Sequence, residues 1–220
     1  KETSSSKEVL LYSDCFQTSN KDSFETRLKQ IGEEIQKIIE KYNPENKILI
    51  CFVGRLLEVK GVKYLIQAVK MIDKEIQKKI KILIVGDGTL RIELETLTKN
   101  NNLNEIVEFT GHKSQEECNQ IMQISDIFIL PSISEGLPLA VLEAMANKCA
   151  LIVTDIGLPV KNKKDGLVVT PKNPKEIKNA IELLTGNKDL REELSKNAFE
   201  KVKKEYTWET AVEKYLKIIE

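Results

Sequence analysis

Short apolar runs alternate with helical segments along most of this chain, and this alternation constrains the fold most strongly. The runs at 47–53, 81–85, 127–130 and 150–154 are almost entirely apolar. Strands that are apolar throughout are buried on both faces of a sheet, as in parallel sheets covered by helices. The pattern therefore predicts an α/β fold, a doubly wound, Rossmann-like parallel sheet with helices on both faces.

Local signals place the remaining elements. Ser114 with Glu117, and Asn173 with Glu176, are capping patterns that start helices. Apolar periodicity and these caps predict strands at 105–109 and 167–169, and helices from about Gly61, near 89–101, from Ser114 to about Ile124, at 138–147, from Asn173, near 188–204 and near 208–219.

The first 46 residues form a separate region in this prediction. Residues 1–20 are polar and resemble a lead-in or linker. Apolar residues then recur at spacings of four and three, which predicts an amphipathic helix whose apolar positions are Phe24, Leu28, Ile31, Ile35, Ile38 and Tyr42. That face packs on the sheet of this chain or docks on a missing domain or partner. We expect a lead-in with this helix at 1–46 and a Rossmann-like domain at 47–220.

Composition excludes several classes of protein. The 34 basic and 34 acidic residues cancel, so the excess of positive charge that is typical of nucleic-acid binders is missing. The basic clusters Lys161–Lys164 and Lys201–Lys204 are interpreted as solvated faces. The single histidine, His112, rules out a zinc site or catalytic triad that needs a second one. No apolar run approaches the 18 residues of a transmembrane segment, and no signal peptide is visible.

Cysteines point to burial rather than to chemistry. The four are far apart in sequence, and none forms a Cys-x-x-Cys pair. Cys51 and Cys149 lie within apolar runs, which favours buried free thiols.

Glycines mark the ends of the predicted strands. In doubly wound folds, ligands bind outside the carboxyl ends of the strands. We therefore expect Arg55, Gly86, Gly111, Glu135 and Gly136 to converge on one crevice, although they lie far apart in the sequence.

Two cations follow the first strand of the sheet. Arg55 comes after Gly54, and Lys60 precedes the helix that starts near Gly61. A pair of cations beside a helix N-terminus suits a diphosphate. The alternative is a surface pairing of Arg55 or Lys60 with Glu58.

Two carboxylates follow the strand at 127–130. Glu135 stands in the loop and Glu143 about two turns along the next helix. By themselves they suit a hydrolase-like acid/base pair, or vicinal hydroxyls held by Glu143 and a sugar near Glu135. The simpler alternative is a salt bridge for Glu143 and a solvated Glu135.

Taken together, these motifs resemble glycosyltransferase family 4, a family of retaining sugar transferases with the two-domain GT-B architecture. The resemblance covers about residues 47–220 in family order, and Trp208 looks like part of the closing helix. It rests on Gly54-Arg-Leu-(x)3-Lys60-Gly61, Val85-Gly-Asp-Gly88, Phe109-Thr-Gly111, Asp126 to Pro131-Ser132, and Glu135-Gly-Leu-Pro-(x)4-Glu143-Ala-Met-Ala.

The resemblance implies a role for each motif residue. Arg55 and Lys60 match the diphosphate ligands, and Glu143 matches the carboxylate that holds the ribose. Glu135 matches the group that touches the donor sugar, so that Glu135, Arg55 and Lys60 are the catalytic candidates. The turn at 111–113 matches the base-binding turn, so His112 lies near the base or is an exposed loop histidine. The remaining donor-binding candidates are Gly54, Gly86, Gly111, Gly136, Leu137, Pro138 and Leu139.

The resemblance also implies what the whole protein does. The donor is a UDP- or GDP-sugar, and no metal or other cofactor is expected because the cationic pair offsets the charge of the leaving group. The acceptor, a glycan or a lipid-linked sugar, belongs to an N-terminal domain that is missing here; the start at Lys1 suggests a fragment, inactive alone. The resemblance further implies a cytoplasmic enzyme whose full-length form lies peripherally at a membrane.

Two other functions are compatible with this chain. The first is a non-catalytic nucleotide-sugar-binding or docking subunit of a split glycosyltransferase. The second, a GT-B-shaped enzyme such as a sugar-nucleotide epimerase, usually needs more histidines and acids than His112 offers.

One segment departs from the family pattern. After the strand at 150–154 the family often has Gly-Gly-x-x-Glu, whereas this chain runs from Asp155 through Gly157 to Asp165 without the second glycine or the acid. The identity of the donor sugar is therefore the least determined property.

Overall fold

The computed structural model describes residues 21–207, 210 and 212. The chain divides into two units, Lys1–Pro44 and Glu45–Glu220. In the first unit, α1 (Lys21–Tyr42) is the helix that the apolar spacing predicts. The predicted helix at 208–219, with Trp208, lies outside the described residues apart from positions 210 and 212.

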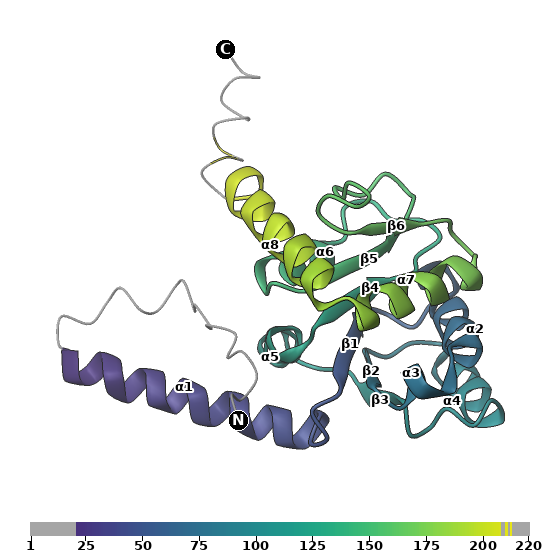
Figure 1. The fold of residues 1–220 in the computed structure, drawn as a ribbon, viewed down its shortest axis with the longest axis horizontal. Helices are drawn as coiled ribbons and strands as arrows, with labels where there is room; N and C mark the ends of the chain where they lie inside the picture. Colours follow the sequence, from purple (N-terminus) through teal and green to yellow (C-terminus); the bar gives the residue numbers. More distant parts are fainter. Residues whose placement is uncertain (1–20, 208–209, 211, 213–220) are drawn as a thin grey trace, which may run out of the picture. The chain divides into compact units, whose positions relative to one another are not determined.

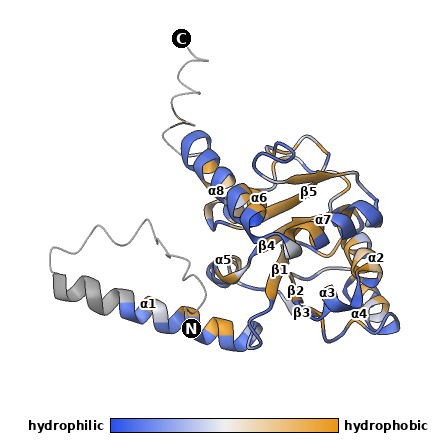
Figure 2. Ribbon diagram, in the orientation of Figure 1, coloured by the Kyte–Doolittle hydropathy of each residue, from blue (hydrophilic) through white to orange (hydrophobic). Residues whose placement is uncertain are grey.

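The second unit is built on a six-stranded parallel sheet in the order β3-β2-β1-β4-β5-β6. Its central strands are fully buried, and Figure 2 shows them as the hydrophobic centre of the unit. The strands are β1 (Ile48–Val53), β2 (Ile80–Val85), β3 (Val107–Gly111), β4 (Ile127–Leu130), β5 (Ala150–Thr154) and β6 (Leu167–Val169).

Helices cover both faces of this sheet (Figure 1). On one face α2 packs between α4 and α7, and on the other α6 packs between α5 and α8. These helices are α2 (Val62–Met71), α4 (Arg91–Asn100), α5 (Gln115–Ile124), α6 (Leu139–Ala146), α7 (Pro174–Gly186) and α8 (Lys188–Glu205); α3 (Lys74–Gln77) and the 3-10 turn η1 (Glu58–Lys60) are short additions. The expected Rossmann-like α/β fold is confirmed.

Caps and buried faces explain where the helices form. The side chain of Ser114 accepts a hydrogen bond from the amide of Glu117, whose carboxylate accepts one from the amide of Ser114, so the predicted capping box starts α5. Asn173 caps α7 as predicted, because its side chain accepts a hydrogen bond from the amide of Glu176. The predicted apolar face of α2 is buried.

Two short elements escaped prediction, and one strand is shifted. The residues of η1 and α3 are too few to show a periodicity, although Asp73 caps α3 through the amide of Glu75. The strand expected at 105–109 is Val107–Gly111, because the carbonyl of Leu103 accepts hydrogen bonds from the amides of Ile106 and Val107 and holds the preceding residues in a turn.

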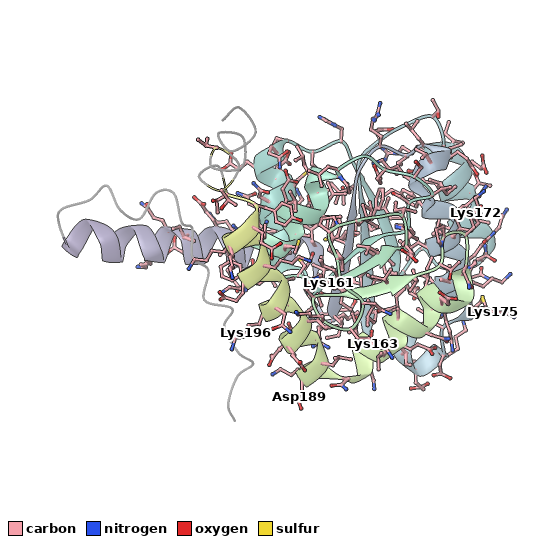
Figure 3. The ribbon with its side chains drawn as sticks, turned by 90° about the horizontal axis from the view of Figure 1, so that it is seen from above. Lys161, Lys163, Lys172, Lys175, Asp189 and Lys196 are labelled. Carbon is pink, nitrogen blue, oxygen red and sulfur yellow. The ribbon has the colours of Figure 1, made fainter. Side chains whose placement is uncertain are left out.

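One lysine-rich segment lies between β5 and β6, and another lies in α8. Lys161 and Lys163 are exposed, as expected for a solvated face, and Figure 3 labels both. The prediction that the second basic cluster, Lys201–Lys204, is a solvated face is wrong for Lys201. Its ammonium lies 2.9 Å from the Asp165 carboxylate and donates to the Pro159 carbonyl at 2.7 Å, with a side chain that is only 11% exposed.

The segment that departs from the family pattern is therefore anchored to α8. Asp165 is buried and also accepts a hydrogen bond from the Lys161 amide at 2.5 Å. Asn197 of α8 donates to the carbonyl of Lys164 at 2.8 Å. Within the described residues, no helix is long and apolar enough to cross a membrane.

We predict that Lys201→Met lowers the free energy of unfolding by about 3 kcal/mol, since it leaves the buried Asp165 carboxylate without its cation. Urea denaturation measures the loss. Lys204→Met, on the exposed side of the same helix, is the matched control. The double variant Asp165→Asn/Lys201→Met should recover part of the loss, and equal stability of Lys201→Met and the parent would contradict the structural role of the pair.

Candidate functional site

The predicted site residues follow the carboxyl ends of parallel strands. Gly54 follows β1, Gly86 follows β2, Gly111 ends β3 and Pro131 follows β4. Because β1 lies between β2 and β4, the chain leaves β1 toward one edge of the sheet and leaves β4 toward the other. Such a switch point is where doubly wound folds place their ligands.

The loop after β1 is fixed by the loop after β2. The amide of Leu56 donates to the carbonyl of Asp87 at 2.9 Å, and the amide of Leu90 donates to the carbonyl of Leu56 at 3.1 Å. A Cβ atom at Gly86 would lie 2.0 Å from the Gly54 carbonyl oxygen, and its φ of +134° also requires glycine. Two loops that approach this closely hold their backbone in place.

Arg55 stands exposed on this fixed loop. The structure gives its guanidinium no hydrogen bond or ion pair with another described residue. The backbone of Arg55 is thus held in place while its guanidinium is unpaired. All five N–H donors of the guanidinium are therefore available to an anionic ligand.

Lys60 is brought to the end of β4 by a second close approach. A Cβ atom at Gly61 would lie 2.0 Å from the Pro131 carbonyl oxygen, and Gly61 has a φ of +67°. The amide of Ile133 donates to the carbonyl of Val59 at 2.7 Å. These contacts join η1 to the loop after β4.

Lys60 pairs with Glu135 across this junction. The Nζ atom of Lys60 lies 2.6 Å from Oε1 of Glu135, and the two side chains are 17% and 11% exposed. The alternative pairing of Lys60 with Glu58 is wrong, because Glu58 binds Lys63 instead. The alternative of a solvated Glu135 is also wrong.

Glu135 is held by a buried hydroxyl, that of Ser132, whose own carbonyl is bound by a second buried hydroxyl. Ser132 donates to Oε1 of Glu135 at 2.7 Å, and Thr154 at the end of β5 donates to the Ser132 carbonyl at 2.5 Å. Both residues are fully buried. The carboxylate of Glu135 is therefore connected to two adjacent strands, β4 and β5.

The loop from Gly136 to Leu139 leads into α6. Gly136 has no atom within 4 Å of an added Cβ, and Leu137 and Leu139 are 57% and 65% exposed. Pro138 is buried and precedes the first turn of α6, which has no side-chain cap. The start of a helix without such a cap presents amide donors outward.

Glu143 lies one turn into α6 and faces α5. Its Oε1 atom accepts a hydrogen bond from Nε2 of Gln115 at 2.9 Å. The alternative of a salt bridge for Glu143 is not borne out, since its recorded partner is an amide. Burial, and next the negative charge of Glu143, raise the pKa of the neighbouring Cys118 thiol, which therefore stays neutral.

The turn after β3 is bordered by an arginine of α4. His112 is exposed, and a Cβ at Gly111 would lie 3.1 Å from a guanidinium nitrogen of Arg91. Arg91 binds Asp87 and Glu95, each at 2.8 Å. The Gly88 amide and then Arg91 hold the pKa of the Asp87 carboxyl below its usual value.

Two clusters thus emerge from the predicted residues. Arg55, Lys60 and Glu135 belong to the loops after β1 and β4, whereas His112 and Glu143 belong with the turn after β3 and α5. Sequence reasoning missed Gln115, Thr154 and the role of Ser132. Ser132 was visible only as part of a motif, and no spacing links Gln115 or Thr154 to the carboxylates that they support.

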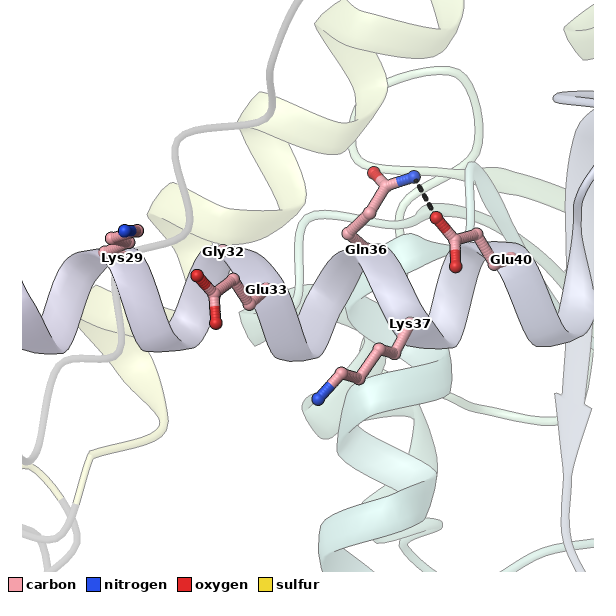
Figure 4. A pocket seen from close by; sticks show the side chains of 6 residues that line it. All are labelled: Lys29, Gly32, Glu33, Gln36, Lys37 and Glu40. Carbon is pink, nitrogen blue, oxygen red and sulfur yellow. Dashed lines mark hydrogen bonds between the residues drawn. The ribbon is translucent and has the colours of Figure 1, made fainter.

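Other parts of the described chain are weaker candidates for a ligand or metal site. The hollow beside α1 is lined by residues of that single helix (Figure 4), among which Gln36 donates to Glu40 at 3.0 Å. One helix alone does not enclose a ligand. Among the described residues, no group of three or more histidine, cysteine, aspartate or glutamate side chains is arranged to hold a metal ion.

We predict that Gly61→Ala destabilises the protein by about 3 kcal/mol, because the new methyl group meets the Pro131 carbonyl and the backbone stays at positive φ. Thermal unfolding measures the effect. Gly186→Ala, which meets nothing within 4 Å, is the matched control. An unchanged melting temperature for Gly61→Ala would show that η1 does not need this close approach to Pro131.

Known structures share this fold. The UDP complex of HepE from Anabaena superposes with a TM-score of 0.77 at 19% identity, over 85% of this chain and 52% of that one. The C-terminal domain of LpcC, a glycosyl transferase group 1 family protein of Francisella tularensis, superposes with a TM-score of 0.70 at 25% identity, over 77% of this chain and 92% of that one.

Sequence relatives agree with this similarity. An uncharacterised glycosyltransferase of Methanocaldococcus jannaschii is 35% identical over 88% of this chain and 50% of its own length. The N,N'-diacetylbacillosaminyl-diphospho-undecaprenol alpha-1,3-N-acetylgalactosaminyltransferase of Campylobacter jejuni is 31% identical over 87% of this chain and 53% of its own length. The chain thus spans about half the length of these relatives. The family model for glycosyl transferases group 1 matches residues 34–201, more than half of the chain. The chain therefore belongs to the glycosyl transferases group 1.

Proposed function

We propose that this chain is the C-terminal, donor-binding domain of a retaining GT-B glycosyltransferase of family 4, and that it binds a UDP- or GDP-sugar. The observation that carries this proposal is the junction of the loops after β1 and β4, where Lys60 meets Glu135. The loop after β1 also carries the exposed Arg55, so two cations follow one strand at a switch point, as suits a diphosphate.

Arg55 and Lys60 bind the diphosphate. Arg55 offers a planar fork for phosphate oxygens, and Lys60 offers a compact charge. The backbone of Gly54 and Gly86, whose close approach fixes the position of Arg55, belongs to the same subsite. The two cations also stabilise the leaving diphosphate as its charge grows, without a metal ion.

Glu143 and the turn after β3 bind the nucleoside. Glu143 accepts hydrogen bonds from the two ribose hydroxyls, and Gln115, which already binds it, orients its carboxylate. The backbone at Gly111 and His112 contacts the base. The hydrogen bond from Gln115 of α5 to Glu143 of α6 supports a position of these two subsites next to each other.

Glu135 and the start of α6 face the donor hexosyl group. The segment of Gly136, Leu137, Pro138 and Leu139 outlines the sugar subsite at an uncapped helix start. Gly136, Leu137 and Leu139 offer backbone N–H donors, whereas Pro138 has none. The carboxylate of Glu135 stabilises the oxocarbenium-like centre as the bond to the diphosphate breaks.

The acceptor belongs to a partner domain. Residues 1–46 then form the lead-in and helix that precede the donor domain at 47–220, which is inactive alone. The Campylobacter jejuni relative is named for a diphospho-undecaprenol acceptor, which supports a lipid-linked glycan as the acceptor and a cytoplasmic enzyme that is peripheral at the membrane.

Titration calorimetry with UDP and GDP tests the proposal directly. We expect one of them to bind, and we expect Arg55→Ala and Glu143→Ala each to weaken binding by about 10- to 100-fold, since each removes hydrogen bonds that involve a charged group. Lys188→Ala and Glu193→Ala, both exposed on α8, are the matched controls.

The same titration identifies the outcome that would contradict the proposal. Failure of both nucleotides to bind at millimolar concentration would exclude a donor domain. Binding without any transfer by the full-length protein would favour the alternative, a non-catalytic subunit of a split transferase.

A further inference from the structure

Glu135 has two partners, and they are of different kinds. Its Oε1 atom accepts from Lys60 Nζ at 2.6 Å and from Ser132 Oγ at 2.7 Å. Lys60 reaches the carboxylate with a long side chain from another loop, whereas Ser132 stands three residues before it on the same loop. The carboxylate is thus held by one cation from a neighbouring loop and one short, buried hydroxyl.

Ser132 is itself fixed. It is fully buried, and its carbonyl accepts the hydroxyl of Thr154, which is also fully buried, at 2.5 Å. The amide of the next residue, Ile133, binds the Val59 carbonyl at 2.7 Å. The backbone that carries the Ser132 hydroxyl is therefore held by contacts to two other segments.

Donor binding changes the partners of Glu135. This step rests on the proposed function, in which Lys60 binds the diphosphate. A diphosphate carries more negative charge than one carboxylate, so it draws the Lys60 ammonium away from Glu135 at least in part. Glu135 then needs a neutral partner that holds it toward the sugar.

We propose that Ser132 is a positioning residue that holds Glu135 for the donor sugar once Lys60 has turned to the diphosphate. Ser132 touches neither the sugar nor the phosphates, and it acts through Glu135. Its hydroxyl therefore contributes to recognition of the sugar and not to recognition of the nucleotide. A serine that only stabilised the fold would affect both ligands equally.

The experiment compares two ligands on the same variants of the full chain. Calorimetry gives the dissociation constants of the nucleoside diphosphate that the parent protein binds and of its glucose conjugate. For Ser132→Ala we expect the conjugate to lose about 5-fold more affinity than the free nucleotide, the effect of one hydrogen bond. Ser195→Ala, which removes a comparable hydrogen bond to the Lys148 carbonyl at 2.6 Å, should change neither constant.

A double-mutant cycle separates positioning from folding. In a Glu135→Ala background, the effect of Ser132→Ala on the ratio of the two constants should vanish, because the group that Ser132 positions is gone. If Ser132→Ala does not fold, Ser132→Cys keeps the volume with a weak donor and is read in the same way.

Three results would overturn the proposal. The first is an equal loss of affinity for both ligands, and the second is an effect that persists in the Glu135→Ala background. The third is a parent protein that binds neither UDP, GDP nor their glucose conjugates, which removes the proposed function and this inference together. A parent that binds normally and an unchanged ratio in Ser132→Ala would refute only the role of Ser132.

Discussion

Parallel pairing of β1 with β4 at the centre of the sheet is the constraint on which the site depends. It places the loop that carries Arg55 and Lys60 beside the loop that carries Ser132 and Glu135, although 75 residues separate Lys60 from Glu135. The backbone contact between Val59 and Ile133, together with the missing side chain at Gly61, closes the remaining distance. The fully buried strands make this arrangement rigid, because their backbones are paired on both sides.

The electrostatics of the junction follow from that placement. A carboxylate that is only 11% exposed is costly without a partner, and Lys60 supplies the charge while Ser132 supplies a hydrogen bond. Arg55, five residues before Lys60, pairs with no carboxylate in the part of the chain that the structure describes. In the free protein, Lys60 is in an ion pair and Arg55 is not. This arrangement suits a ligand with more than one negative charge.

Sequence reasoning was most successful where signals are local. Capping at Ser114 and Asn173, the apolar face of α2 and the strands at 127–130, 150–154 and 167–169 all appear as predicted. It failed where partners are distant. Lys201 was interpreted as solvated because nothing near it in sequence shows that it reaches Asp165, and Lys60 was compared with the nearby Glu58 rather than with Glu135.

The amino-acid sequence alone is enough to predict the fold class and the set of candidate residues. Apolar strands and glycine-ended loops are properties of short segments, so they are visible before the chain folds. Which of these residues meet depends on the folded chain. The pairing of Lys60 with Glu135, the bond from Thr154 to the Ser132 carbonyl, and the bond from Gln115 to Glu143 all join different elements. Strand order and close backbone approach set these contacts, and neither is encoded in local spacing.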